Sequence, residues 1–194
     1  MSKRLFLLID LVRTNTYKNG EGDTPEWYHT YIDDRLESIR RALQYCQKNN
    51  VDTMKLNFLK SPDDPIDGDN EILQGFNFTY SWNWESTNGS PDHFNRLYHN
   101  YETIYFTGAS LDACVTRTRN HSYSGIINQK REISAAKSST IILNCCIQDF
   151  LIQKEGRRIE PDWQSVDDLY EYKIQYLKDF NYHYEESLGG VYEN

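Results

Sequence analysis

One cysteine of this chain stands where a sequence can make a thiol reactive. Residues 104–106 form a short apolar run that ends at Thr107-Gly108, and the residues after Leu111 can all continue as helix. This pattern predicts a strand, a tight turn and a helix. Cys114 would then lie in the first helical turn, where unpaired N–H groups and the helix dipole favour a thiolate. The same amides could hold an oxyanion formed by attack on a carbonyl.

Asp10 is the second residue whose position suggests chemistry. It ends the continuous apolar run Leu5 to Ile9, which is typical of a strand buried on both faces. Open α/β sheets place their chemistry at the carboxyl ends of such strands. Each residue also has a purely structural interpretation: Asp10 as a turn cap, and Cys114 as a small buried apolar side chain.

The segment Gly108-Ala109-Ser110-Leu111-Asp112-Ala113-Cys114-Val115 resembles the nucleophile segment of the isochorismatase-like cysteine hydrolases. Asp10, at the end of the first apolar strand and before a polar loop, is a second match to that superfamily. The resemblance covers roughly residues 4 to 150 and is specific at these two segments only. It implies a three-layer αβα sandwich with a mostly parallel, Rossmann-like central sheet, formed here by one domain over residues 1–194.

The resemblance also implies the roles of individual residues. Cys114 would be the nucleophile, and Asp10 would take its proton and later give it to the leaving amine. The amides of Ala113 and Cys114 would form the oxyanion hole, and a cis peptide is expected at Ala109-Ser110. No cofactor is implied.

The family's lysine is not found at its expected place, some thirty residues before the cysteine. No lysine occurs between Lys60 and Lys130. Lys60 follows the second predicted strand and would neighbour Asp10 in the family's strand order, so it is our candidate for the missing positive charge. Its alternative is a solvated loop residue.

Aromatic and polar residues alternate strictly from Phe76 to Trp84, which predicts a strand near the sheet edge. Three of its aromatic side chains are candidate pocket residues for a planar ligand, with packing against a helix as the alternative: Tyr80, Trp82 and Trp84. Elsewhere the patterns predict a helix from Thr24 to about Lys48, strands over 51–59 and 140–147, and a helix with an apolar stripe from Val166 to Phe180. No strand is predicted in the tail 181–194, which would lie on a partner subunit or remain disordered.

The amino-acid composition disfavours some classes of binding partner. The net charge is −8 and the pI is near 5.1, which disfavours nucleic acid and anionic membranes. The four cysteines suggest neither a disulfide framework nor a zinc pair, the acidic segment 61–69 fits no EF-hand loop, and no metal site is predicted. No run is long enough for a membrane span, so we expect a cytoplasmic protein. Its expected partners are a small molecule and, because such pockets often use a neighbouring subunit, further copies of itself.

The leading hypothesis is therefore a hydrolase that cleaves an amide or similar C–N bond of a small molecule through a thioester on Cys114. The alternative, favoured by the missing lysine, is a member of the fold that has lost turnover and binds a ligand or a protein. A third reaction, protonation of a vinyl ether by Asp10 alone, is disfavoured by the presence of Cys114.

Overall fold

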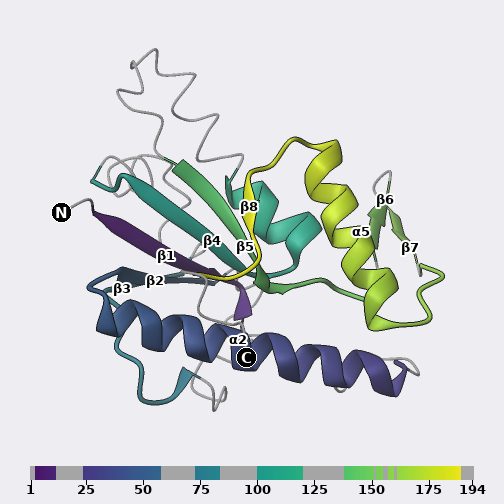
Figure 1. Ribbon diagram of the computed structural model, residues 1–194, viewed down its shortest axis with the longest axis horizontal. Coiled ribbons are helices and arrows are strands. Elements are labelled where there is room, and N and C mark those ends of the chain that lie inside the picture. The colour runs from purple at the N-terminus through teal and green to yellow at the C-terminus, as the bar shows by residue number, and fades with distance from the viewer. Residues whose placement is uncertain are drawn as a thin grey trace.

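The computed structural model describes residues 3–11, 24–57, 73–83, 100–119, 138–150, 152–154, 157–159 and 161–188. Within them the main sheet has six strands in the order β3-β2-β1-β4-β5-β8, all paired in parallel (Figure 1). The strands are β1 (Arg4–Ile9), β2 (Asp52–Asn57), β3 (Tyr80–Asn83), β4 (Thr103–Ala109), β5 (Ser138–Ile147) and β8 (Tyr184–Glu185). This confirms the predicted α/β class with a parallel central sheet.

Helices cover both faces of the sheet. On one face α2 (Glu26–Lys48) packs against Phe6 and Leu8 of β1. On the other face Leu5, Leu7 and Ile9 meet the π-helical turn η5 (Leu111–Val115) and α5 (Val166–Asp179). Because successive residues of a strand point to opposite faces, the continuous apolar run of β1 supplies both cores. A small antiparallel hairpin, β6 (Ile152–Lys154) with β7 (Arg157–Ile159), lies beside α5 in Figure 1.

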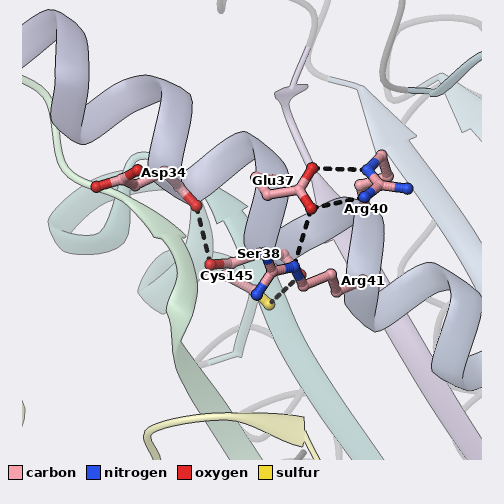
Figure 2. Close-up of polar contacts among 6 residues, drawn as sticks. All are labelled: Asp34, Glu37, Ser38, Arg40, Arg41 and Cys145. Atoms are coloured by element: carbon pink, nitrogen blue, oxygen red, sulfur yellow. Dashed lines mark hydrogen bonds and ion pairs between the residues drawn. The ribbon is translucent and has the colours of Figure 1, made fainter. Parts of the chain in front are cut away.

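The helix predicted from Thr24 to about Lys48 is α2, and it buries one apolar stripe at helical spacing: Tyr28, Tyr31, Ile32, Leu36, Ile39, Ala42, Leu43 and Cys46. The opposite side of the helix carries Glu37, whose carboxylate pairs with Arg40 at 2.6 Å and with Arg41 at 2.9 Å (Figure 2). Figure 2 also shows the helix contacting β5, because the Cys145 thiol donates to the Ser38 carbonyl at 3.6 Å. Amphipathic helices gain most of their stability from such one-sided burial.

Three predictions about the elements are corrected. The tail holds a strand, β8, whose two residues were too few to show a period. The aromatic strand is shorter than predicted, with only residues 80–83 in β3, although it does lie at the sheet edge as expected. Phe180, assigned to the buried stripe of α5, lies just past the helix end and is 59% exposed.

A lysine takes the place of a core residue in α5. Lys173 lies between Leu169 and Leu177 at helical spacing, and all three are fully buried. Its ammonium donates to the carbonyls of Leu143 at 2.9 Å and Cys146 at 2.7 Å. β8 pairs with β5 only at residues 141 and 142, so these carbonyls lie past the part of β5 that pairs with β8. Lys173 donates to both, and the Tyr31 hydroxyl also donates to the Cys146 carbonyl at 3.2 Å.

No described helix is both long enough and apolar enough to cross a membrane.

Candidate active site

The two residues singled out for chemistry follow adjacent strands. β1 and β4 pair in parallel with Ile9 opposite Gly108. Asp10 leaves β1 directly after that pair, and Cys114 follows from β4 through a short turn and η5. Parallel strands end at the same edge of a sheet, so their carboxyl ends bring together side chains that are far apart in sequence. The Cys114 Sγ donates to Asp10 Oδ2 at 3.4 Å.

The backbone at Asp10 is held in an unusual conformation. Its φ is +50°, a left-handed value that Asp tolerates better than most residues. Its amide donates to the Leu56 carbonyl at 2.7 Å, which ties the residue to β2. Asp10 is 8% exposed, whereas Cys114 is only partly buried. The carboxylate residue is therefore the buried member of the pair, and the cysteine is the one with partial exposure to solvent.

Gly108 permits the close approach of β1 and β4 at this point. Its φ is +110°, and a Cβ added there would lie 1.9 Å from the Ile9 carbonyl oxygen. We expect Gly108→Ala to lower the free energy of unfolding in urea by about 2 kcal/mol more than Gly75→Ala, because overpacking adds to the cost of the positive φ. Gly75 is the matched control, since its φ is +83° and its Cβ would meet nothing within 4 Å. Equal losses in the two variants would show that the contact with Ile9 is not limiting.

The turn between β4 and η5 is anchored by the end of β5. The Ala109–Ser110 peptide is cis, at the position that the family resemblance implied. The Ser110 hydroxyl donates to Asp112 Oδ1 at 3.0 Å and accepts from the Asp149 amide at 3.1 Å. The amide of Asp112 donates to the side-chain oxygen of Gln148 at 3.3 Å. Gln148 is fully buried, so this anchor is shielded from water.

α5 holds the other side of the same turn, a contact that the sequence did not predict. The Tyr172 hydroxyl donates to Asp112 Oδ2 at 3.2 Å. One turn later, the Tyr176 hydroxyl donates to the Asp112 carbonyl at 3.4 Å and shares a hydrogen bond with Thr116. The sequence does show that the two tyrosines are four residues apart, which places both on one face of a helix. It does not show what that face contacts.

The predicted oxyanion hole is only partly available. The Ala113 amide already donates to the Ser110 carbonyl at 3.2 Å, so it is engaged within the turn. The Cys114 amide makes no hydrogen bond to the described part of the chain. An amide that the sequence analysis missed, that of Ser110, donates to the Cys114 sulfur and lowers the pKa of the thiol.

The expectation of a thiolate at Cys114 is wrong for the resting site. Burial, followed by the charge of Asp10 and the hydrogen bond to it, raises the pKa of Cys114 to about 12. The Ser110 amide and the charge of Arg117 act in the opposite direction but do not outweigh them. Cys114 is therefore a thiol that donates to a carboxylate, and it would have to lose its proton before it could act as a nucleophile.

Of the remaining candidate residues, only Tyr80 has a side chain that the structure describes. Lys60 and Trp84 lie outside the described residues, and Trp82 is described only as part of β3. The prediction that Tyr80 lines the pocket is corrected. Tyr80 interacts with Tyr101, and the Tyr101 hydroxyl donates to Asp52 at the start of β2 at 2.6 Å. Tyr80 therefore contacts the amino-terminal end of the sheet, whereas Asp10 and Cys114 lie at its carboxyl-terminal end. Within the described residues, no three His, Cys, Asp or Glu side chains form a metal-binding group.

Solved structures share this fold at very low sequence identity. An isochorismatase from Pseudomonas putida aligns at a TM-score of 0.58 and 11% identity, covering 93% of this chain and 85% of its own. N-carbamoylsarcosine amidase from Thermoplasma acidophilum aligns at a TM-score of 0.53 and 15% identity, covering 97% of this chain and 99% of its own. Pyrazinamidase/nicotinamidase from Streptococcus mutans aligns at a TM-score of 0.51 and 9% identity, covering 94% of this chain and 100% of its own. No protein-family model matches the chain, and no curated protein matches its sequence.

Proposed function

We propose that this chain is a divergent isochorismatase-like cysteine hydrolase that cleaves an amide or related C–N bond of a small molecule. The observation that carries the proposal is the 3.4 Å contact between Cys114 Sγ and Asp10 Oδ2 at the ends of two adjacent parallel strands. The partial exposure of Cys114 and the burial of Asp10 support the same assignment. The solved structures with this fold include an amidase and a nicotinamidase.

The proposed reaction proceeds in two halves. As the Cys114 sulfur bonds to the substrate carbonyl carbon, Asp10 takes the thiol proton, and the Cys114 amide donates to the developing oxyanion. The tetrahedral intermediate collapses, the C–N bond breaks, and the leaving amine takes the proton from Asp10. A water molecule then attacks the thioester through its oxygen, and Asp10 takes a proton from that water. When the C–S bond breaks, Asp10 returns that proton to Cys114 and the carboxylic acid is released.

The experiment is to trap the thioester. We expect a panel containing nicotinamide, N-carbamoylsarcosine and simpler primary amides to include a compound that adds its acyl group to Cys114 and loses its amine. Intact-protein mass spectrometry after a rapid acid quench would detect the added mass, and hydroxylamine would remove it. Cys114→Ala is the control, since it keeps the fold and removes the nucleophile. A panel that leaves no acyl group on Cys114 and releases no amine would contradict the proposal.

The raised pKa of Cys114 favours a second candidate function. A thiol held next to a carboxylate, without a described cation close enough to offset it, also suits a member of the fold that binds a ligand without turnover. In that case a panel compound would raise the thermal midpoint of the wild type and of Cys114→Ala equally, and no amine would appear. We retain Lys60 as the candidate cation, because it follows in the sequence the strand β2, which neighbours β1 in the sheet.

We also propose that residues 1–194 form one domain that acts in the cytoplasm as a homo-oligomer, with a small molecule as substrate and no nucleic-acid partner. The fold shared over 97% of the chain with the amidase supports a single domain, and the net charge of −8 disfavours nucleic acid. Light scattering coupled to size exclusion measures the number of copies directly.

A further inference from the structure

An arginine lies one helical turn after the nucleophile. Cys114 and Arg117 are three residues apart, in η5 and in the α-helix that continues it over residues 116–119. Residues with this spacing share a face of a helix, and their side chains lean toward its N-terminus. This tendency directs the Arg117 side chain back along the helix on the side of Cys114. The charge of Arg117 acts to lower the pKa of the Cys114 thiol.

Arg117 has no partner among the residues that the structure describes. Its side chain is exposed, and it makes no hydrogen bond, ion pair or ring contact with the described residues. Arg119, two residues later, instead stacks on the ring of Tyr182 with its guanidinium 4.6 Å from the ring centre. Thr116 and Thr118 on the same segment are buried. Arg117 is thus the residue of this segment that presents its charge to solvent beside the site.

Two described carboxylates lie near the sulfur, and each accepts hydrogen bonds from groups other than Arg117. Asp10 accepts from Cys114, and Asp112 accepts from Ser110 through one oxygen and from Tyr172 through the other. In a chain with a net charge of −8, an exposed cation beside the reactive sulfur gives the site a local attraction for anions. A guanidinium also presents its donors as a planar fork that matches a carboxylate.

We propose that Arg117 binds a carboxylate of the substrate, so that the site takes small amides that carry a negative charge. This inference rests on the proposed hydrolase function for the identity of the reacting group, and it adds the substrate class. The reacting carbonyl of such a substrate lies at Cys114 Sγ, and its carboxylate lies toward the second turn of the helix.

Charge selection at Cys114 can be measured without knowing the substrate. Iodoacetate and iodoacetamide both add a carbon to the sulfur: the C–S bond forms, the C–I bond breaks, iodide leaves, and the thiol proton passes to solvent. They differ in carrying or lacking a carboxylate. The readout is the ratio of their rates at Cys114, mapped by peptide mass spectrometry and divided by the same ratio for N-acetylcysteine. The other three cysteines are buried.

We expect the normalised ratio to favour iodoacetate in the wild type and to fall about 10-fold or more in Arg117→Gln, which corresponds to the loss of one charge-assisted hydrogen bond. Arg41→Gln is the matched control, because it removes an arginine that pairs with Glu37 on α2 (Figure 2). It should leave the ratio unchanged. A ratio that is the same in the wild type and in Arg117→Gln would overturn the proposal.

A second measurement does not need a reactive sulfur. In a Cys114→Ala background, succinamate, an amide with a carboxylate, should raise the thermal midpoint more than its neutral analogue succinamide. The difference should vanish when Arg117→Gln is added. Equal shifts with and without Arg117 would overturn the anion site. If Cys114 forms no thioester while succinamate still depends on Arg117, the hydrolase proposal fails and the anion site stands.

Discussion

Asp10→Asn should lower the rate of amide hydrolysis by about 10²- to 10⁴-fold, the range that a positioned general acid–base contributes. Asparagine keeps the shape of the side chain but cannot accept the Cys114 proton at the 3.4 Å contact. The resting thiol, whose pKa is about 12, would then have no base beside it. The measurement is amine release under saturating concentrations of whichever panel compound acylates Cys114.

The same variant should change thiol reactivity in the opposite direction. The charge of Asp10 and its hydrogen bond both raise the pKa of Cys114, so removing the charge should lower that pKa. The inflection in a plot of alkylation rate against pH should therefore move to lower pH while hydrolysis falls. Asp34→Asn, an exposed position on the outer side of α2, is the control and should change neither quantity. Undiminished hydrolysis in Asp10→Asn would exclude Asp10 as the acid–base.

Lys173→Ala should lower the free energy of unfolding by about 5 kcal/mol. It leaves the buried Leu143 carbonyl without its ammonium donor, at about 1–3 kcal/mol, leaves the Cys146 carbonyl with the Tyr31 hydroxyl, and opens a cavity in the core. Lys173→Met keeps most of the side-chain volume and removes only the hydrogen bonds of the ammonium, so the expected loss in the free energy of unfolding is about 3 kcal/mol. Denaturant unfolding measures both. Lys178→Ala, at an exposed position of the same helix, should change stability by less than about 0.5 kcal/mol.

The stability difference between the wild type and Lys173→Met should also depend on pH. Burial lowers the pKa of Lys173 from 10.5 to about 7. Below pH 7 the folded and unfolded states both hold the proton, but from pH 7 upward the unfolded state holds a proton that the folded state has lost. The wild type should therefore gain stability relative to Lys173→Met by up to about 1.4 kcal/mol per pH unit.

Measurements between pH 7 and 9 avoid the titration of the buried tyrosines. A difference that stays constant over this range would contradict the assigned role of Lys173 as a buried ionisable group.

Local patterns predicted the elements that carry the site. A continuous apolar run over 5–9 predicted a strand and the pattern of residues 24–48 predicted a helix, and the structure contains both. The segment from Gly108 to Cys114 was recognised by its resemblance to a family's nucleophile segment, and the apolar run before it predicted the strand that leads into it. Residues 184–185 were missed because two residues have no period. β8 exists because the edge of β5 is available to pair with it.

The contacts around the turn between β4 and η5 could not be predicted from the sequence. Nothing near Asp112 in the chain indicates that Tyr172, sixty residues later, donates to it. The sequence predicted a thiolate at Cys114 because helix position is a local property. The pKa of Cys114 instead follows burial and the charge of Asp10, which depend on how β1 and β4 align. Neither burial nor a charge 104 residues away can be read from the residues beside Cys114.

The sequence by itself therefore determined the α/β class, the order of most elements, and the two positions from which a thiol and a carboxylate leave their strands. Only the tertiary structure decided that these groups touch, that the Ala113 amide is already engaged, and that Lys173 lies in the core. The physical reason is the separation along the chain over which each interaction acts. Hydrophobic period and turn chemistry act over a few residues, whereas burial, hydrogen-bond partners at a sheet edge and charge–charge interactions are set by segments that meet only when the chain folds.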